Sequence, residues 1–132
     1  MSSNWVDDIY GMHRHYGVHR VVDQMDADKL RQYLQFRINF LQEELDEMRS
    51  ADNAEDVVDA LIDLCVVAIG TLDAFNVDSH KAWNSVLEAN MNKQVGIKES
   101  RPNPLGLPDL IKPEGWKPPS HENNHGLLSS IF

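Results

Sequence analysis

The residues best suited to chemistry are carboxylates that gather in one stretch of the chain. Nine of the 21 acidic residues lie between Glu43 and Asp63, and Arg49 is the only basic residue among them. Carboxylate oxygens are hard ligands, and a group without His or Cys favours Mg²⁺ or Mn²⁺ over zinc or copper. Several such groups converging on one place can hold two metals, which neutralise a phosphate chain and activate water. The stretch therefore predicts metal-dependent chemistry on a phosphate compound.

Two helices must position these carboxylates. Apolar periodicity predicts one helix over about residues 27–49 and another over about 54–76. At 100° per residue, Glu44 falls in the middle of the apolar face of the first helix. Asp59 and Asp63 stand one turn apart in the second helix, which is apolar nearly all round and so belongs at the centre of a bundle. Ionised carboxylates in such places are costly unless they are paired or bound to a metal. The candidate metal ligands on facing sides of the two helices are Glu43, Glu44, Glu47, Asp59 and Asp63.

Simpler explanations cover part of this pattern. Arg37 lies beside Glu44 on the same helix face, so the two could form a buried salt bridge, but that pairing leaves the other carboxylates unexplained. Glu55 and Asp56 fit a solvated first turn that the helix dipole stabilises. Asp63 fits that explanation less well, because the residues on both sides of it are typical of a core.

Two further helices are expected, over about residues 4–16 and 79–95, with Gly17 ending the first. The apolar stripe expected on the first of them is Trp5, Ile9, Met12 and Tyr16. The other helix carries Asn90 on its apolar stripe and Lys93 one turn on, and near a metal–phosphate site both are suited to contact phosphate or nucleotide. A lone Asn there could equally be a satisfied core amide. The candidate substrate contacts are Arg37, Asn90 and Lys93.

The segment over residues 98–132 differs from the rest of the chain. It holds all six prolines, which exclude long helices, yet it carries nine large apolar side chains. We expect an extended arm whose Trp116 and residues 127–132 pack on the helical body, across a subunit boundary. Four short helices are also too few to cover the apolar residues of the helix over 54–76. This arithmetic predicts an intertwined dimer with a pooled core.

Length, charge and cysteine content narrow the class of protein. The chain has 132 residues, enough for one helical domain over 1–97 followed by the arm. Its net charge of −9 disfavours a nucleic-acid partner. The absence of any run of about 18 apolar residues excludes a membrane span. A single cysteine, Cys65, and an N-terminus without the pattern of a secretory signal favour the cytoplasm. The six histidines suggest no metal site, and those near the end of the first helix are interpreted as exposed polar residues: His13, His15 and His19.

The carboxylate helices resemble a known enzyme family. Glu43, Glu44 and Glu47 match the EExxE half of the signature of MazG-type enzymes, and residues 59–71 resemble its second half. Three more segments resemble the corresponding parts of phage members: residues 12–17, 86–93 and 112–119. The second half departs from the usual ExxD pattern, because Ala60 stands three residues before Asp63. The additional ligand is therefore Asp59 or Asp56.

The resemblance implies a fold and an activity. Members are all-α nucleoside triphosphate pyrophosphatases related to phosphoribosyl-ATP pyrophosphohydrolase, built as four-helix bundles intertwined in dimers or tetramers. They hydrolyse an NTP or dNTP to the monophosphate and pyrophosphate with two or more Mg²⁺ or Mn²⁺ ions. Carried over, Glu43, Glu44 and Glu47 would be catalytic and would hold the metals with Asp63. Phage members imply a host-cytoplasmic role in nucleotide pools and a preference for (d)GTP.

Two other classes of protein explain the sequence less well. A ferritin-like di-metal protein needs Glu-x-x-His pairs on core helices, and the only such pair, Glu122 and His125, lies in the proline-rich arm. A non-catalytic acidic adaptor would explain the net charge. It would not explain carboxylates on the apolar faces of two helices.

Overall fold

The structure is a computed structural model that describes residues 4–98, 100 and 103–132. Residues 1–3 and Pro102 lie outside the described residues. The expected absence of a secretory signal depends in part on residues 1–3, and Pro102 belongs to the expected arm. The chain forms two compact units. The first contains the residues up to Ser79 together with Asn123–Phe132, and the second contains His80–Glu122. Within the described residues, no helix is long and apolar enough to cross a membrane.

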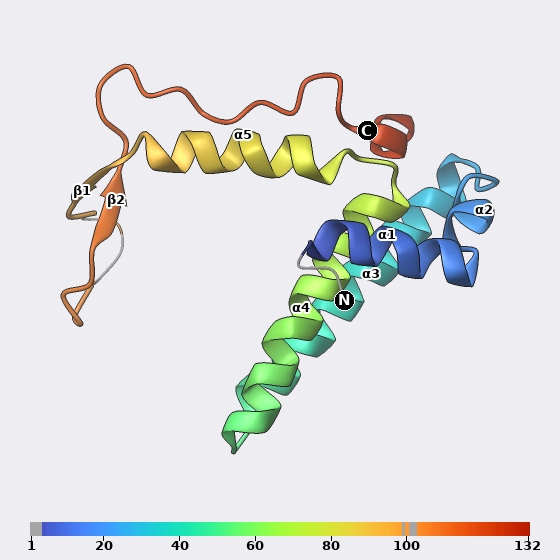
Figure 1. Cartoon of the computed structure of the whole chain (residues 1–132), viewed down its shortest axis with the longest axis horizontal. Coiled ribbons are helices and arrows are strands. Elements are labelled where there is room, and N and C mark those ends of the chain that lie inside the picture. Colours follow the sequence, from blue (N-terminus) through green and yellow to red (C-terminus); the bar gives the residue numbers. More distant parts are fainter. Residues whose placement is uncertain (1–3, 99, 101–102) are drawn as a thin grey trace. The chain divides into compact units, whose positions relative to one another are not determined.

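The first unit is built from helices (Figure 1). They are α1 (Trp5–Tyr16), α2 (Val18–Val22), α3 (Ala27–Ser50), α4 (Ala54–Ala74) and the short 3₁₀ helix η1 (Gly126–Ser130). Helix α4 packs along α3 over their length and also contacts α1 and α2. The two carboxylate-bearing helices are therefore direct neighbours.

Each long helix of this unit starts at a side-chain cap, and of these caps Asp26 was a candidate from the sequence. Asn4, Asp26 and Asn53 accept hydrogen bonds from the backbone N–H groups three residues on, at 3.2, 2.9 and 2.8 Å. Such caps satisfy donors that have no partner inside the helix. Gly17 ends α1 in the left-handed conformation, with φ 73°. These caps fix where α3 and α4 begin and hence the register of their acidic residues.

The core of the first unit is closed by the C-terminal residues. Phe75 is fully buried, stacks on the Tyr33 ring at 5.6 Å and packs with Ile131. The N–H of Leu127 donates to the carbonyl oxygen of Phe75 at 2.7 Å. A Cβ at Gly126, where φ is 54°, would collide with that same carbonyl, so the close approach needs glycine. The C-terminal segment is therefore part of this core.

Part of the segment expected to form an arm packs on the helical core of its own chain. Leu127, Leu128 and Ile131 pack on the helical core, but they do so within one chain, and the side chain of Phe132 is 91% exposed.

The second unit contains helix α5 (Ser79–Met91) from His80 onward and two short strands, β1 (Gln94–Gly96) and β2 (Asp109–Ile111). The strands pair antiparallel, with Val95 opposite Leu110. The chain after β2 runs back along α5 (Figure 1), where the indole N–H of Trp116 donates to the carbonyl oxygen of Ala89 at 2.7 Å. Ser85 and Ser120 add two more hydrogen bonds between the same segments.

The all-α prediction is confirmed, with three local differences. Helix α5 ends at Met91 rather than near residue 95, because residues 94–96 pair with β2. Helix α2 was not expected, since five residues carry too little periodicity to be seen. On α1 the buried residues are Ile9 and His13, whereas the other members of the expected stripe, Trp5, Met12 and Tyr16, are exposed. Which face of this helix is buried depends on its contacts with α4.

Candidate functional site

Glu44 occupies the position that the sequence marked as anomalous. Its side chain lies within the apolar side of α3, and the residue is only 8% exposed. Its Oε2 atom is buried and has no hydrogen-bond partner among the described residues. A buried polar atom without a partner is rare and costly in native proteins. This oxygen therefore points to a ligand that the protein chain itself does not supply.

The surroundings of Glu44 are acidic. Burial raises the pKa of Glu44 above its ordinary value, and the negative charges of Glu47, Asp63 and Glu43 raise the pKa further. A side-chain hydrogen bond with Glu47 acts in the same direction. The fold thus brings four carboxyl groups from α3 and α4 within electrostatic reach of one another.

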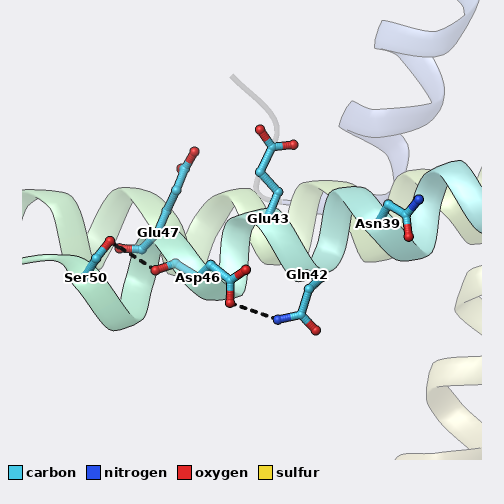
Figure 2. A pocket seen from close by; sticks show the side chains of 6 residues that line it. All are labelled: Asn39, Gln42, Glu43, Asp46, Glu47 and Ser50. Atoms are coloured by element: carbon cyan, nitrogen blue, oxygen red, sulfur yellow. Dashed lines mark hydrogen bonds between the residues drawn. The ribbon is translucent and has the colours of Figure 1, made fainter.

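The exposed side of this cluster borders a shallow surface hollow of about 510 Å³. Figure 2 shows Glu43 and Glu47 pointing to the same side of α3, one turn apart. Asp46 turns away from them and accepts a hydrogen bond from the Gln42 amide at 2.9 Å. The residues that line the hollow are Asn39, Gln42, Glu43, Asp46, Glu47 and Ser50. The Glu43 and Glu47 carboxylates are therefore open to solvent and to a bound solute, while Glu44 is not.

The aspartates of α4 occupy different environments. Asp63 is half-buried and acts on the pKa of Glu44, whereas Asp59, one turn earlier, is exposed. Asp56 is also exposed and accepts a hydrogen bond from the Asn53 amide at 2.9 Å in the cap of the helix. The capping role gives Asp56 a structural purpose that Asp59 lacks.

Arg37 is used inside the first unit. Its Nε donates to Thr71 Oγ1 at 2.9 Å, and its guanidinium also donates to the carbonyl oxygen of Val67 at 3.0 Å. It lies over the Phe40 ring at 5.6 Å. The described residues contain no ion pair between Arg37 and Glu44, so the salt-bridge explanation does not account for the buried carboxylate. Arg37 instead joins α3 to α4.

Comparison with protein families gives a match over the acidic helices. The model described as phosphoribosyl-ATP pyrophosphohydrolase matches residues 19–90, more than half of the chain. The chain belongs to the phosphoribosyl-ATP pyrophosphohydrolase family. The resemblance to MazG-type enzymes is thereby confirmed at the level of this superfamily. No curated protein matches the chain.

Family membership assigns the chain to pyrophosphohydrolases that act on nucleotides. The segment matched to the phosphoribosyl-ATP pyrophosphohydrolase model contains α3 and α4 entirely, and with them every carboxylate of the cluster. Hard oxygen donors and a buried oxygen without a partner suit divalent cations such as Mg²⁺ or Mn²⁺. The donor set therefore fits the metal dependence that is typical of these pyrophosphohydrolases.

The other expected substrate contacts lie in the second unit. Asn90 is exposed on α5 rather than buried as a core amide. Lys93 is half-buried, and its Nζ lies 5.3 Å from the centre of the Trp116 ring; Lys112 lies 5.0 Å from the same ring. Both residues stay candidates for contact with substrate.

One polar cluster of this pyrophosphohydrolase was missed from the sequence. His13, expected to be exposed, is buried, and His19 is half-buried; both lie within hydrogen-bond distance of Asp73. His15 is exposed as expected. A signal was available, because His13 follows Ile9 by four residues and so shares its helix face. The partner Asp73 is 60 residues away, and no local pattern connects the two.

Proposed function

We propose that the chain is a nucleoside triphosphate pyrophosphohydrolase that converts a (d)NTP to the monophosphate and pyrophosphate with Mg²⁺ or Mn²⁺. The observation that supports this proposal is the buried Oε2 of Glu44, without a partner and beside three further carboxyl groups. If Glu44 had only a structural role, such an oxygen would be paired with a donor or neutralised. Two or more divalent cations would neutralise the cluster and leave positive charge for a phosphate chain.

The proposed role of each carboxylate follows from how exposed it is. Glu44, Glu47 and Asp63 would hold the cations, with Asp59 as the additional ligand. When bound, the cations supply the positive charge that the phosphate oxygens need in the transition state and make water a better nucleophile. Glu43 is exposed and borders the hollow, so its carboxylate is suited to orient and deprotonate the attacking water. Attack occurs at the α-phosphorus, and pyrophosphate leaves.

We also propose contacts with the rest of the substrate. Asn90 and Lys93 would bind phosphate oxygens or the base, and Arg37 would act mainly by holding α3 against α4 near the triphosphate. We propose (d)GTP as the preferred substrate and the cytoplasm of the host as the location, on the likeness to phage members alone.

The proposal includes a homo-oligomer, a dimer or a tetramer. Helix α4 exposes Val58, Leu61 and Ile62 in the single chain, and α3 exposes Phe36 and Ile38. Large apolar side chains gathered on one pair of helices usually mark an interface. Light scattering at micromolar concentration checks this, and a monomeric mass would contradict it.

The decisive experiment identifies products and the attacked atom. The full chain is incubated with each dNTP and NTP and with phosphoribosyl-ATP, in ¹⁸O-water with Mg²⁺ or Mn²⁺. We expect monophosphate carrying one ¹⁸O and unlabelled pyrophosphate, and no reaction after addition of a chelator. Diphosphate with orthophosphate would exclude attack at the α-phosphorus. Faster hydrolysis of phosphoribosyl-ATP than of any triphosphate would exclude the proposed substrate class.

Variants test the residues. Glu44→Gln, Glu47→Gln and Asp63→Asn should each lose most of the activity, while Asp28→Asn, an exposed carboxylate in the first turn of α3 and outside the hollow, keeps it. Near-wild-type turnover in any two of the three would refute the site assignment. Circular dichroism of each variant shows whether the helices survive.

A further inference from the structure

We propose that His13, His19 and Asp73 form a second metal site, for a divalent transition metal such as Zn²⁺, separate from the carboxylate cluster. The three donor atoms, His13 Nδ1, His19 Nε2 and Asp73 Oδ2, all lie within 4.8 Å of one another. The two nitrogens are 2.7 and 2.8 Å from the same carboxylate oxygen. One ion could therefore be reached by all three after small movements of the side chains.

The donor chemistry distinguishes this site from the carboxylate cluster. Two imidazoles and one carboxylate suit borderline metals such as Zn²⁺, Co²⁺ or Fe²⁺, whereas oxygen ligands alone suit Mg²⁺ and Mn²⁺. Zinc sites bind nitrogen and oxygen at about 2.0–2.2 Å, which places neighbouring ligand atoms roughly 3–3.5 Å apart in a tetrahedral arrangement. Each nitrogen needs to move away from the Asp73 oxygen by roughly half an ångström, and the two nitrogens, which are no more than 4.8 Å apart, need to approach each other by at most about 1.5 Å.

Second-sphere contacts already orient His19. Its Nδ1 faces the amide oxygen of Asn76 at 3.1 Å, and the amide nitrogen of Asn76 donates to an oxygen of Asp23 at 2.8 Å. This second bond fixes which end of the Asn76 amide faces the imidazole, so Nδ1 carries the proton. The nitrogen that faces Asp73 is then the one that would bind a metal, and the ion would replace the proton between Nε2 and the Asp73 oxygen. Metal-binding histidines commonly donate their other N–H to such an acceptor.

Burial and position argue for a built site rather than surface residues that meet by chance. His13 is 6% exposed and Asp73 is 9% exposed, while His19 keeps enough exposure for an ion to enter. The ligands come from α1, α2 and the last turn of α4, so one ion would tie the N-terminal helices to the end of the central helix. His13 lies outside the segment that matches the family model. The site is thus not a feature of the matched segment alone.

Zinc binding tests the proposal in a background that lacks the first site. The Glu44→Gln/Glu47→Gln protein is dialysed against Zn²⁺, and bound metal is measured by mass spectrometry. We expect one Zn²⁺ per chain, retained when the exposed histidine next on α1 is changed (His15→Ala) and lost in His19→Ala and Asp73→Asn. Zn²⁺ should also raise the melting temperature of the background protein and leave that of its His19→Ala form unchanged.

A second experiment leaves all three proposed metal ligands unchanged. Co²⁺ added to the wild-type chain should give intense visible bands, because nitrogen ligands and low coordination number strengthen them, whereas an all-oxygen site gives weak ones. Asn76→Gly, which keeps the left-handed backbone at φ 61° and removes the amide, should weaken Zn²⁺ binding by about 10- to 100-fold. Weak bands alone, or unchanged zinc content in His19→Ala, would show that the cluster is only a hydrogen-bonded network.

Discussion

Replacing Glu44 by Gln should make the metal-free protein more stable while removing its stabilisation by metal. The substitution keeps the shape of the side chain and removes its charge. In the native chain the Oε2 atom is buried without a partner, and three carboxyl groups face it. A Gln amide nitrogen at the same place can donate to those carboxylates. The repulsive contact then becomes an attractive one.

The expected gain in the free energy of unfolding follows from the buried oxygen of Glu44. A buried polar group without a partner costs about 1–3 kcal/mol, and the variant recovers that amount in the absence of metal. For a chain of this length the gain corresponds to a melting temperature raised by roughly 4–12 °C. In saturating Mn²⁺ the order should reverse, because the wild-type protein gains the binding free energy of the ions and the variant gains little of it.

The pH dependence has a definite sign. The pKa of Glu44 is raised in the folded state above its ordinary value of 4.5. Proton binding therefore favours the folded state. The resulting stabilisation is complete below the unfolded pKa and is lost as pH rises through the folded pKa. Without metal, the wild-type free energy of unfolding should thus increase on acidification toward pH 4.5 relative to that of Glu44→Gln.

Thermal unfolding followed by circular dichroism measures these differences, in chelator and in Mn²⁺, at several pH values. Asp46→Asn is the matched control, since this exposed carboxylate lies on the same helix and turns away from the cluster. Its free energy of unfolding should stay within about 0.5 kcal/mol of the wild-type value. A Glu44→Gln protein that melts below wild type in chelator, or that gains as much as wild type from Mn²⁺, would refute the reasoning.

Three further substitutions test the fold. Gly70→Ala should destabilise the chain by about 1–3 kcal/mol in urea unfolding, because the new Cβ would lie 2.8 Å from a guanidinium nitrogen of Arg37; equal stability would show that Arg37 moves aside freely. Ile131→Ala should cost about 2–4 kcal/mol by uncovering the core, measured in the same way, and a loss near zero would mean that the C-terminal segment is not part of that core. Trp116→Phe removes the bond to the Ala89 carbonyl, and hydrogen exchange should speed up in residues 80–122 and not in α3; uniform protection would contradict the contact.

Local patterns were sufficient to predict the long helices of the first unit. Asp26 and Asn53 are capping residues that precede apolar periodicity, and the structure starts α3 and α4 directly after them. The anomaly of Glu44 was also predictable, because a charge at the centre of an apolar face is visible from 3.6-residue spacing alone. Helical geometry needs only neighbours in sequence, so sequence shows it well.

Features that depend on distant residues were not predictable in this way. His13 is buried because Asp73 receives it, and the apolar residues Trp5 and Tyr16 on the same helix are left exposed. The strand at 94–96 exists through its pairing with residues 109–111, and three residues carry no usable alternation. In each case the feature depends on a partner that is distant in sequence. A hydrophobicity pattern reports only on neighbouring residues, so it does not reveal that partner.

The clasp formed by Asn124 gives the chain a modular topology. Its side-chain oxygen accepts from the N–H of Asp78 at 2.8 Å, and its amide nitrogen donates to the Asp78 carbonyl at 2.9 Å. The polypeptide therefore leaves the first unit and re-enters it at adjacent points, so residues 80–122 form an insertion with closed ends. Insertions of this kind can lengthen, shorten or be exchanged during evolution at little cost in loop entropy. The acidic helices can thus stay constant while the inserted unit diversifies.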